Sequence, residues 1–181
     1  MAKRIPPKKL EGVRILFRNF SGEEGQYNRK GDRNFAIALP EDEAVKMLDE
    51  GWNVKRLKPR EDEELGTAYV SVAINFDRRP PVITLVTKRM GDDIQIHMPE
   101  DQLDALDWID IAYADVTLNP FQWEVNGNTG VKAYLKSLVV IQEIDEILAK
   151  YDHIPVAGGG SAHLAIEAGD EDVLEGEIVD D

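Results

Sequence analysis

Cationic and aromatic side chains alternate along one predicted strand in the second half of the chain. In this segment Val131, Ala133 and Leu135 alternate with Lys132, Tyr134 and Lys136. Because successive side chains of a strand point to opposite faces, the first set fits a barrel core and the second forms an exposed row. Cations that follow phosphates and aromatics that stack on bases are what a sequence-neutral groove for single-stranded nucleic acid requires. An ordinary amphipathic strand with a half-buried tyrosine would give the same pattern.

A second strand is predicted to face this one. Phe121 and Trp123 share one face of the extended segment 111–125, and Asn126-Gly127 begins the turn that leads into the segment 131–142. This pair of segments is the clearest hairpin in the sequence. We expect Phe121, Trp123 and Tyr134 to stack on bases. Phe20 and Tyr27 are further aromatic candidates.

Basic residues cluster in the first half of the chain. The polar, glycine-rich loop 21–33 contains three cations beside Tyr27, and the segment 53–60 contains four cations in eight residues. Such clusters are often only solvated surface, yet together they favour a phosphate-binding role. The predicted phosphate contacts are Arg18, Arg29, Lys30, Arg33, Lys55, Lys58, Lys132 and Lys136.

The net charge of −14 hides a strong polarity along the 181 residues. Residues 1–90 hold 18 Lys and Arg against 14 Asp and Glu, whereas residues 91–181 hold 3 against 21. Residues 152–181 contain nine acidic residues and no Lys or Arg. A basic half is typical of a nucleic-acid binder, and the acidic end accounts for much of the overall charge.

The sequence motifs of common catalytic sites are missing. There is no cysteine, the three histidines are scattered, and no phosphate loop or nucleophile elbow occurs. We therefore expect no metal, no cofactor and no enzymatic activity. The many carboxylates leave a metal-dependent nuclease as a third interpretation.

Short strands and a few brief helices are predicted between these groups. Strands are predicted over 12–20, 34–39, 53–59, 67–76, 82–89, 94–98, 111–125 and 131–142, and helices over 40–50, 99–108 and 143–151. This pattern favours a mainly β fold, an OB-like five-stranded barrel, over a βαβ sheet; a β-sandwich is the alternative. We expect a flexible basic arm over residues 1–11, the barrel domain over 12–151, and a disordered glycine-containing linker and acidic tail over 152–181.

Three segments resemble a family of small tailed-phage proteins that bind single-stranded DNA. They are residues 17–22, residues 51–60 and the hairpin residues 123–136, and the resemblance covers about residues 12–150. It implies an OB-fold with an acidic C-terminal tail that contacts replication proteins and competes with DNA for the groove. Tails of that class commonly end in an aromatic residue, whereas this chain ends in Ile178-Val179-Asp180-Asp181.

The predicted function is sequence-nonspecific binding of single-stranded DNA in phage replication or recombination. The predicted partners are single-stranded DNA, replication or recombination proteins through residues 170–181, and a second copy of the chain. The expected location is the cytoplasm, which is that of the host if the protein is phage-encoded. The main alternative is a β-barrel protein-interaction module or phage structural protein.

Overall fold

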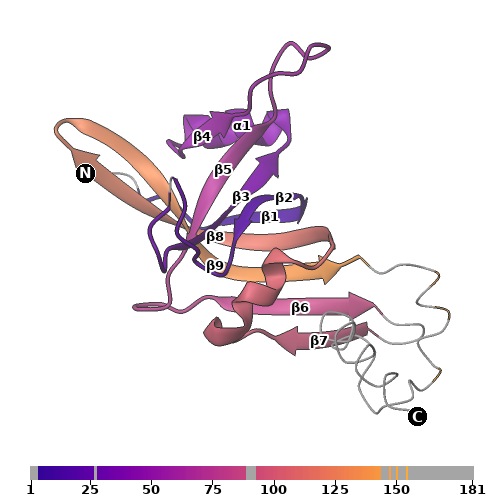
Figure 1. Ribbon diagram of the computed structural model, residues 1–181. Helices are drawn as coiled ribbons and strands as arrows, with labels where there is room; N and C mark the ends of the chain where they lie inside the picture. The colour runs from indigo at the N-terminus through magenta and orange to yellow at the C-terminus, as the bar shows by residue number, and fades with distance from the viewer. Residues whose placement is uncertain are drawn as a thin grey trace. The chain divides into compact units, whose positions relative to one another are not determined.

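The computed structural model describes residues 4–26, 28–88 and 93–143, together with Ile147, Lys150 and Ile154. Strands make up most of this part of the chain (Figure 1). The elements are β1 (Lys8–Val13), β2 (Ile15–Asn19), β3 (Arg33–Leu39), α1 (Glu41–Asp49), β4 (Val54–Arg56), β5 (Ala68–Ile74), β6 (Val82–Lys88), β7 (Asp93–His97), the 3-10 helix η1 (Glu100–Asp107), β8 (Ile111–Val125) and β9 (Asn128–Gln142). No helix among the described residues is both long enough and apolar enough to cross a bilayer.

The strands form a curled sheet whose order is β1-β8-β9-β5-β3-β2. The two ends of this open path, β1 and β2, are consecutive parts of one segment and are separated only by Arg14. β5 and β9 pair in parallel, and the other neighbours on the path pair antiparallel. This is the connectivity of a partly open OB barrel in which β1 and β2 together form the first strand. The predicted mainly β, OB-like fold is confirmed.

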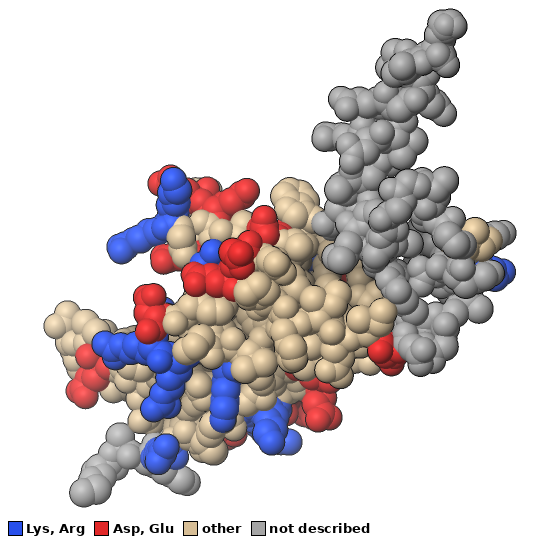
Figure 2. Space-filling model, turned by 90° about the horizontal axis from the view of Figure 1, so that it is seen from below, with Lys and Arg blue, Asp and Glu red and all other residues tan. Residues whose placement is uncertain are grey.

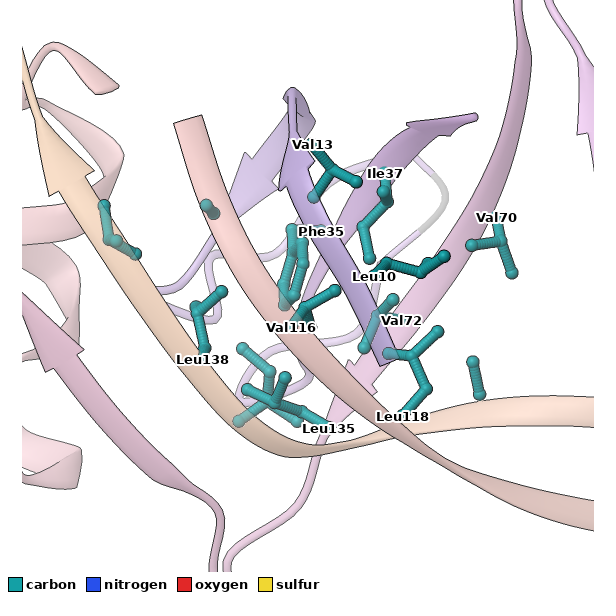
Figure 3. Close-up of a cluster of buried hydrophobic side chains, with 14 of the residues drawn as sticks. Leu10, Val13, Phe35, Ile37, Val70, Val72, Val116, Leu118, Leu135 and Leu138 are labelled. Carbon is teal, nitrogen blue, oxygen red and sulfur yellow. The ribbon is translucent and has the colours of Figure 1, made fainter. Parts of the chain in front are cut away.

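The core of the barrel collects buried side chains from β1, β3, β5, β8 and β9, and Ile15 of β2 packs against it (Figure 3). The labelled residues are Leu10, Val13, Phe35, Ile37, Val70, Val72, Val116, Leu118, Leu135 and Leu138, and all of them are buried. Apolar residues at alternate positions of β3, β5 and β9 supply most of this cluster. Burial of this surface is the main favourable contribution to the stability of the barrel.

Two insertions extend the five barrel strands. α1 and β4 lie between β3 and β5, and β4 pairs with β5. The helix follows Pro40 and ends before Gly51, which has a φ of 93°, so its predicted ends are confirmed. The second insertion consists of β6, β7 and η1, and β6 pairs in parallel with β9 beyond the point where β5 leaves it.

The first strand begins earlier than its sequence indicates. Residues 8–10 pair with β8, so the expected arm of residues 1–11 is a strand from Lys8 onward. The Lys8 ammonium contacts Glu43 on α1 and lies 3.5 Å from a carboxylate oxygen of Glu50. Burial on its own lowers the pKa of Lys8, but the two carboxylates outweigh it and raise that pKa above its ordinary value. The predicted helix over 143–151 and the linker and tail fall almost wholly outside the described residues.

Candidate nucleic-acid interface

One face of the sheet brings the predicted hairpin residues together with side chains of β4 and β5. Tyr69 on β5 lies opposite Lys55 on β4, and Ala73 lies opposite Tyr134 on β9. Across the hairpin, Lys132 lies opposite Phe121. Because paired residues share a face, a single surface runs from β4 across β5 and β9 to β8.

A hollow follows this surface between the loop before β3 and the β8–β9 hairpin. We call it the sheet groove; its volume is about 710 Å³. Its lining residues are 28, 31–34, 53, 55, 71–77, 100, 123 and 132–134. Oligonucleotides bind OB-folds on the face of the second and third barrel strands, between the loop after the first strand and the loop before the last. The sheet groove occupies that position, with β3 and β5 as its floor.

The aromatic residues of the hairpin are exposed and held in place. The side chains of Trp123 and Phe121 are 36% and 54% exposed. The indole of Trp123 lies against Gly130, where an added Cβ would be 2.6 Å from Cζ2 of the ring. Phe121 meets Tyr134 edge to face with ring centroids 5.9 Å apart, and Nζ of Lys132 lies 5.1 Å from the Tyr134 centroid. Rings fixed in this way can stack on bases with little loss of side-chain entropy.

Two of the three cations that line the sheet groove form no ion pair with described residues, although Asp32, Asp77 and Glu100 also line it. In the described part of the chain, neither Lys55 nor Lys132 forms an ion pair. Arg33 differs, because its guanidinium donates to Glu100 at 2.8 Å and to the Phe20 carbonyl at 3.0 Å. Lys55 and Lys132 are therefore free to meet phosphates, whereas Arg33 holds the rim of the groove together.

The loop before β3 is held by side-chain hydrogen bonds. The Asn28 amide donates to the carbonyls of Glu23 and Asp32 at 2.9 and 2.8 Å, and its oxygen accepts from Asn34. The backbone N–H groups of Phe20 and Ser21 donate to the Asp107 carboxylate at 2.7 and 3.0 Å. These hydrogen bonds connect the described loop residues to each other and to the η1 segment, and the loop forms one wall of the groove.

Some predicted site residues lie elsewhere. Phe20 is fully buried and stacks on Phe35 with centroids 5.1 Å apart, so it belongs to the core and cannot reach a base. Arg18 donates to the carbonyls of Leu106 and Ile109 at 3.0 and 2.6 Å, which ties β2 to the η1 segment instead of lining the groove. Tyr27 lies outside the described residues.

The remaining predicted cations are exposed but do not line the sheet groove. Arg29 and Lys30 lie in the loop before β3, between the lining residues Asn28 and Gly31, and Lys58 follows β4. Lys136 is the extra residue of a bulge, because Leu135 pairs with Leu118 and Ser137 pairs with Thr117. The bulge ends the alternation that placed Lys136 beside Lys132 and Tyr134 in the sequence pattern.

The sequence pattern missed an aromatic pair on the same face of the sheet. Regular alternation along the predicted strand 12–20 would put Phe17 on the same face as the buried Val13, yet Phe17 is 61% exposed and has a φ of 50°. Its ring meets Tyr69 edge to face at 5.7 Å. A register shift between Leu16 and Asn19 interrupts the alternation and turns Phe17 outward. The unbroken apolar run of residues 15–17 gave no sign of this irregularity.

The charges on the surface are unevenly spread. Figure 2 shows a band of Lys and Arg side chains along one face, with a few Asp and Glu side chains among them. Within the residues that the structure describes, no three His, Asp or Glu side chains are grouped closely enough to hold a metal ion.

The chain is similar to several solved structures of phage proteins. The single-stranded DNA-binding protein from bacteriophage Enc34, as a C-terminal truncation, is 13% identical with a TM-score of 0.49, covering 77% of this chain and 87% of that one. The Enc34 protein in complex with ssDNA is 12% identical with a TM-score of 0.49, covering 77% and 88%. The single-stranded DNA-binding protein gp2.5 of bacteriophage T7 is 10% identical with a TM-score of 0.36, covering 86% and 97%.

A family model matches the entire chain. No curated protein sequence matches this chain. The model of a phage ssDNA-binding domain, however, matches residues 1–181. This match confirms three predictions: the resemblance to phage proteins, single-stranded DNA as the partner, and a role in binding instead of catalysis. The chain therefore belongs to the family of phage ssDNA-binding domains.

Proposed function

We propose that this protein coats single-stranded DNA during phage replication or recombination, and that the strand lies in the sheet groove. The observation that carries this proposal is the shared face of Trp123, Tyr134, Lys132 and Lys55. Aromatic platforms beside unpaired cations suit a strand whose bases are unstacked and whose phosphates are exposed. The protein would meet such strands in the cytoplasm of the host.

Each side chain of the groove has a separate role in this proposal. Trp123 and Tyr134 stack on bases, and Lys55 and Lys132 bind the phosphates between them. Arg29, Lys30 and Lys58 are exposed beside the groove and contact the backbone at its rim. None of these groups reads a base edge in a fixed pattern, so binding has little sequence preference.

A salt series with single-stranded and duplex DNA tests the groove. We expect oligo-dT to bind far more tightly than a duplex of equal length, because duplex bases cannot stack on Trp123 and Tyr134. The logarithm of the affinity should fall with the logarithm of the salt concentration by about 0.7 for each phosphate contact. A protein that ignores oligo-dT at moderate salt would be an interaction or structural module, and cleavage of labelled DNA with Mg²⁺ would indicate a nuclease.

The acidic segment supplies the second part of the proposal. Residues 152–181 carry nine acidic residues and no basic ones. We propose that residues 170–181 compete with DNA for the sheet groove and, once displaced, bind replication or recombination proteins. Scattered aliphatic residues among acids, such as Val173 and Leu174, suit a docking peptide.

Removal of residues 152–181 tests the competition. The shortened chain should bind oligo-dT more tightly than the full chain, and the difference should shrink as salt screens both interactions. The matched control keeps the full chain length, and its acidic residues in this segment are changed to their amides. Unchanged or weaker binding by both forms would contradict competition without affecting the groove assignment.

A further inference from the structure

A second hollow lies on the other side of Tyr134 from the sheet groove. We call it the arginine cavity; its volume is about 740 Å³. Arg4 from the segment before β1 and Arg78 and Arg79 from the β5–β6 connection line it, together with Phe121. Arg4 is more than seventy positions from Arg78 and Arg79, and Phe121 is 42 positions beyond Arg79, so these residues meet only in the folded chain.

The arginine cavity has positive charge and no counter-charge. None of its lining residues is acidic, whereas Asp32, Asp77 and Glu100 all line the sheet groove. In the described part of the chain, none of the three arginines forms an ion pair. Guanidinium groups hold phosphates through paired hydrogen bonds, and they are present here without a protein acceptor.

The two hollows adjoin each other. Asn75 and Tyr134 line both of them. Trp123 lines only the sheet groove, Phe121 lines only the arginine cavity, and Tyr134 lines both. Phe121 lies two residues from Trp123 on the same face of β8, and its ring contacts Tyr134 of β9. A row of three aromatic rings therefore leads from one hollow to the other, and a chain with alternating bases and phosphates can follow it.

We propose that single-stranded DNA leaving the sheet groove passes over Tyr134 and continues into the arginine cavity. There Arg4, Arg78 and Arg79 bind its phosphates and Phe121 stacks on a base. This inference rests on the proposed function of the sheet groove and lengthens the footprint of the protein beyond it. It also gives the segment before β1 a role in binding, through Arg4.

A length series of oligo-dT with the double variant R78A/R79A tests the extension. On long oligonucleotides the variant should bind about tenfold more weakly than the full wild-type chain, and its salt slope should fall by about 1.4, or 0.7 for each lost phosphate contact. On the shortest oligonucleotides that bind, which fill only the groove, both proteins should bind equally. K46A/R60A is the matched control, since both residues are exposed and line neither hollow.

Each other outcome has a distinct meaning. If the wild-type chain binds no oligo-dT, the proposed function itself fails. If the wild type binds and R78A/R79A matches it at every length, or loses equally at every length, only the extension is overturned. Tighter binding of oligo-dT by the variant would indicate that the acidic segment, and not DNA, occupies the arginine cavity. Circular dichroism checks folding, and R4A gives an independent reading if the double variant is unfolded.

Discussion

Trp123 illustrates how a single neighbour prepares a side chain for binding. Its indole is packed against a position without a side chain, Gly130, and still leaves 36% of its surface exposed. One side of the ring is thus supported by the opposite strand while part of the ring remains available to a ligand. A ring immobilised before binding loses less entropy when a base stacks on it.

Replacing Trp123 with alanine should weaken binding to oligo-dT by about 1–3 kcal/mol, the usual contribution of one stacked base. The variant W108A is the control, because Trp108 is 75% exposed yet lines neither hollow. Fluorescence anisotropy with a labelled oligonucleotide measures the affinities of both variants. Equal losses in W123A and W108A would show that the effect is not specific to the groove.

At the scale of elements, the β8–β9 hairpin depends on Gly130 to seat that indole. Changing Gly130 to alanine would put a Cβ 2.6 Å from Cζ2 of Trp123, so the ring must move. We expect G130A to weaken binding in the same direction as W123A, with a smaller effect on the unfolding midpoint. G25A is the control, because a Cβ there meets nothing within 4 Å. An unchanged affinity for G130A would mean that the position of the ring does not matter.

The contact between α1 and β4 predicts a pH effect on stability. Hydrogen bonds from the Arg56 guanidinium lower the pKa of Glu41 below its ordinary value of 4.5. Because the folded chain favours the carboxylate, this contribution is present above the unfolded pKa and is lost as the pH falls through the folded one. E41Q should therefore lower Tm slightly near pH 7 and match the wild type in strong acid. E61Q, which removes a charge that is in no described ion pair, should show no such trend.

Regular elements were predictable from the sequence, and irregular backbone was not. The hairpin followed from alternation on both sides of Asn126-Gly127, and β8 has its predicted bounds. α1 followed from Pro40 and Gly51. Phe17 and Lys136 were misplaced because a register shift and a bulge broke the alternation at those points. Arg78 and Arg79 appeared as an ordinary basic pair, since only the fold brings Arg4 and Phe121 beside them.

At the scale of the whole molecule, the last strand holds the barrel together. β9 pairs with β8 along its length and also with β5 and β6, so three other strands depend on it. Two of these pairings are parallel and join residues more than fifty positions apart. β5, β6 and β8 each lack a partner until β9 is in place, so we expect the barrel to unfold as one cooperative unit.

Truncation should reveal this dependence. A chain that ends at residue 151 keeps β9 and should unfold in one cooperative transition in urea, whereas a chain that ends at residue 127 lacks β9 and should show none. Near-ultraviolet circular dichroism separates a packed core from a loosely collapsed one. A cooperative transition in the shorter chain would show that β1–β8 form a stable unit by themselves.

The late position of β9 also has a consequence for synthesis on the ribosome. While the nascent chain is still growing, β5 has been made but β9, its partner on one edge, has not. That edge of β5 is open to wrong partners during this interval, and pairings between distant segments form slowly. Translation speed through residues 111–142, and chaperones that shield that edge, should therefore influence how much of the protein reaches its native state.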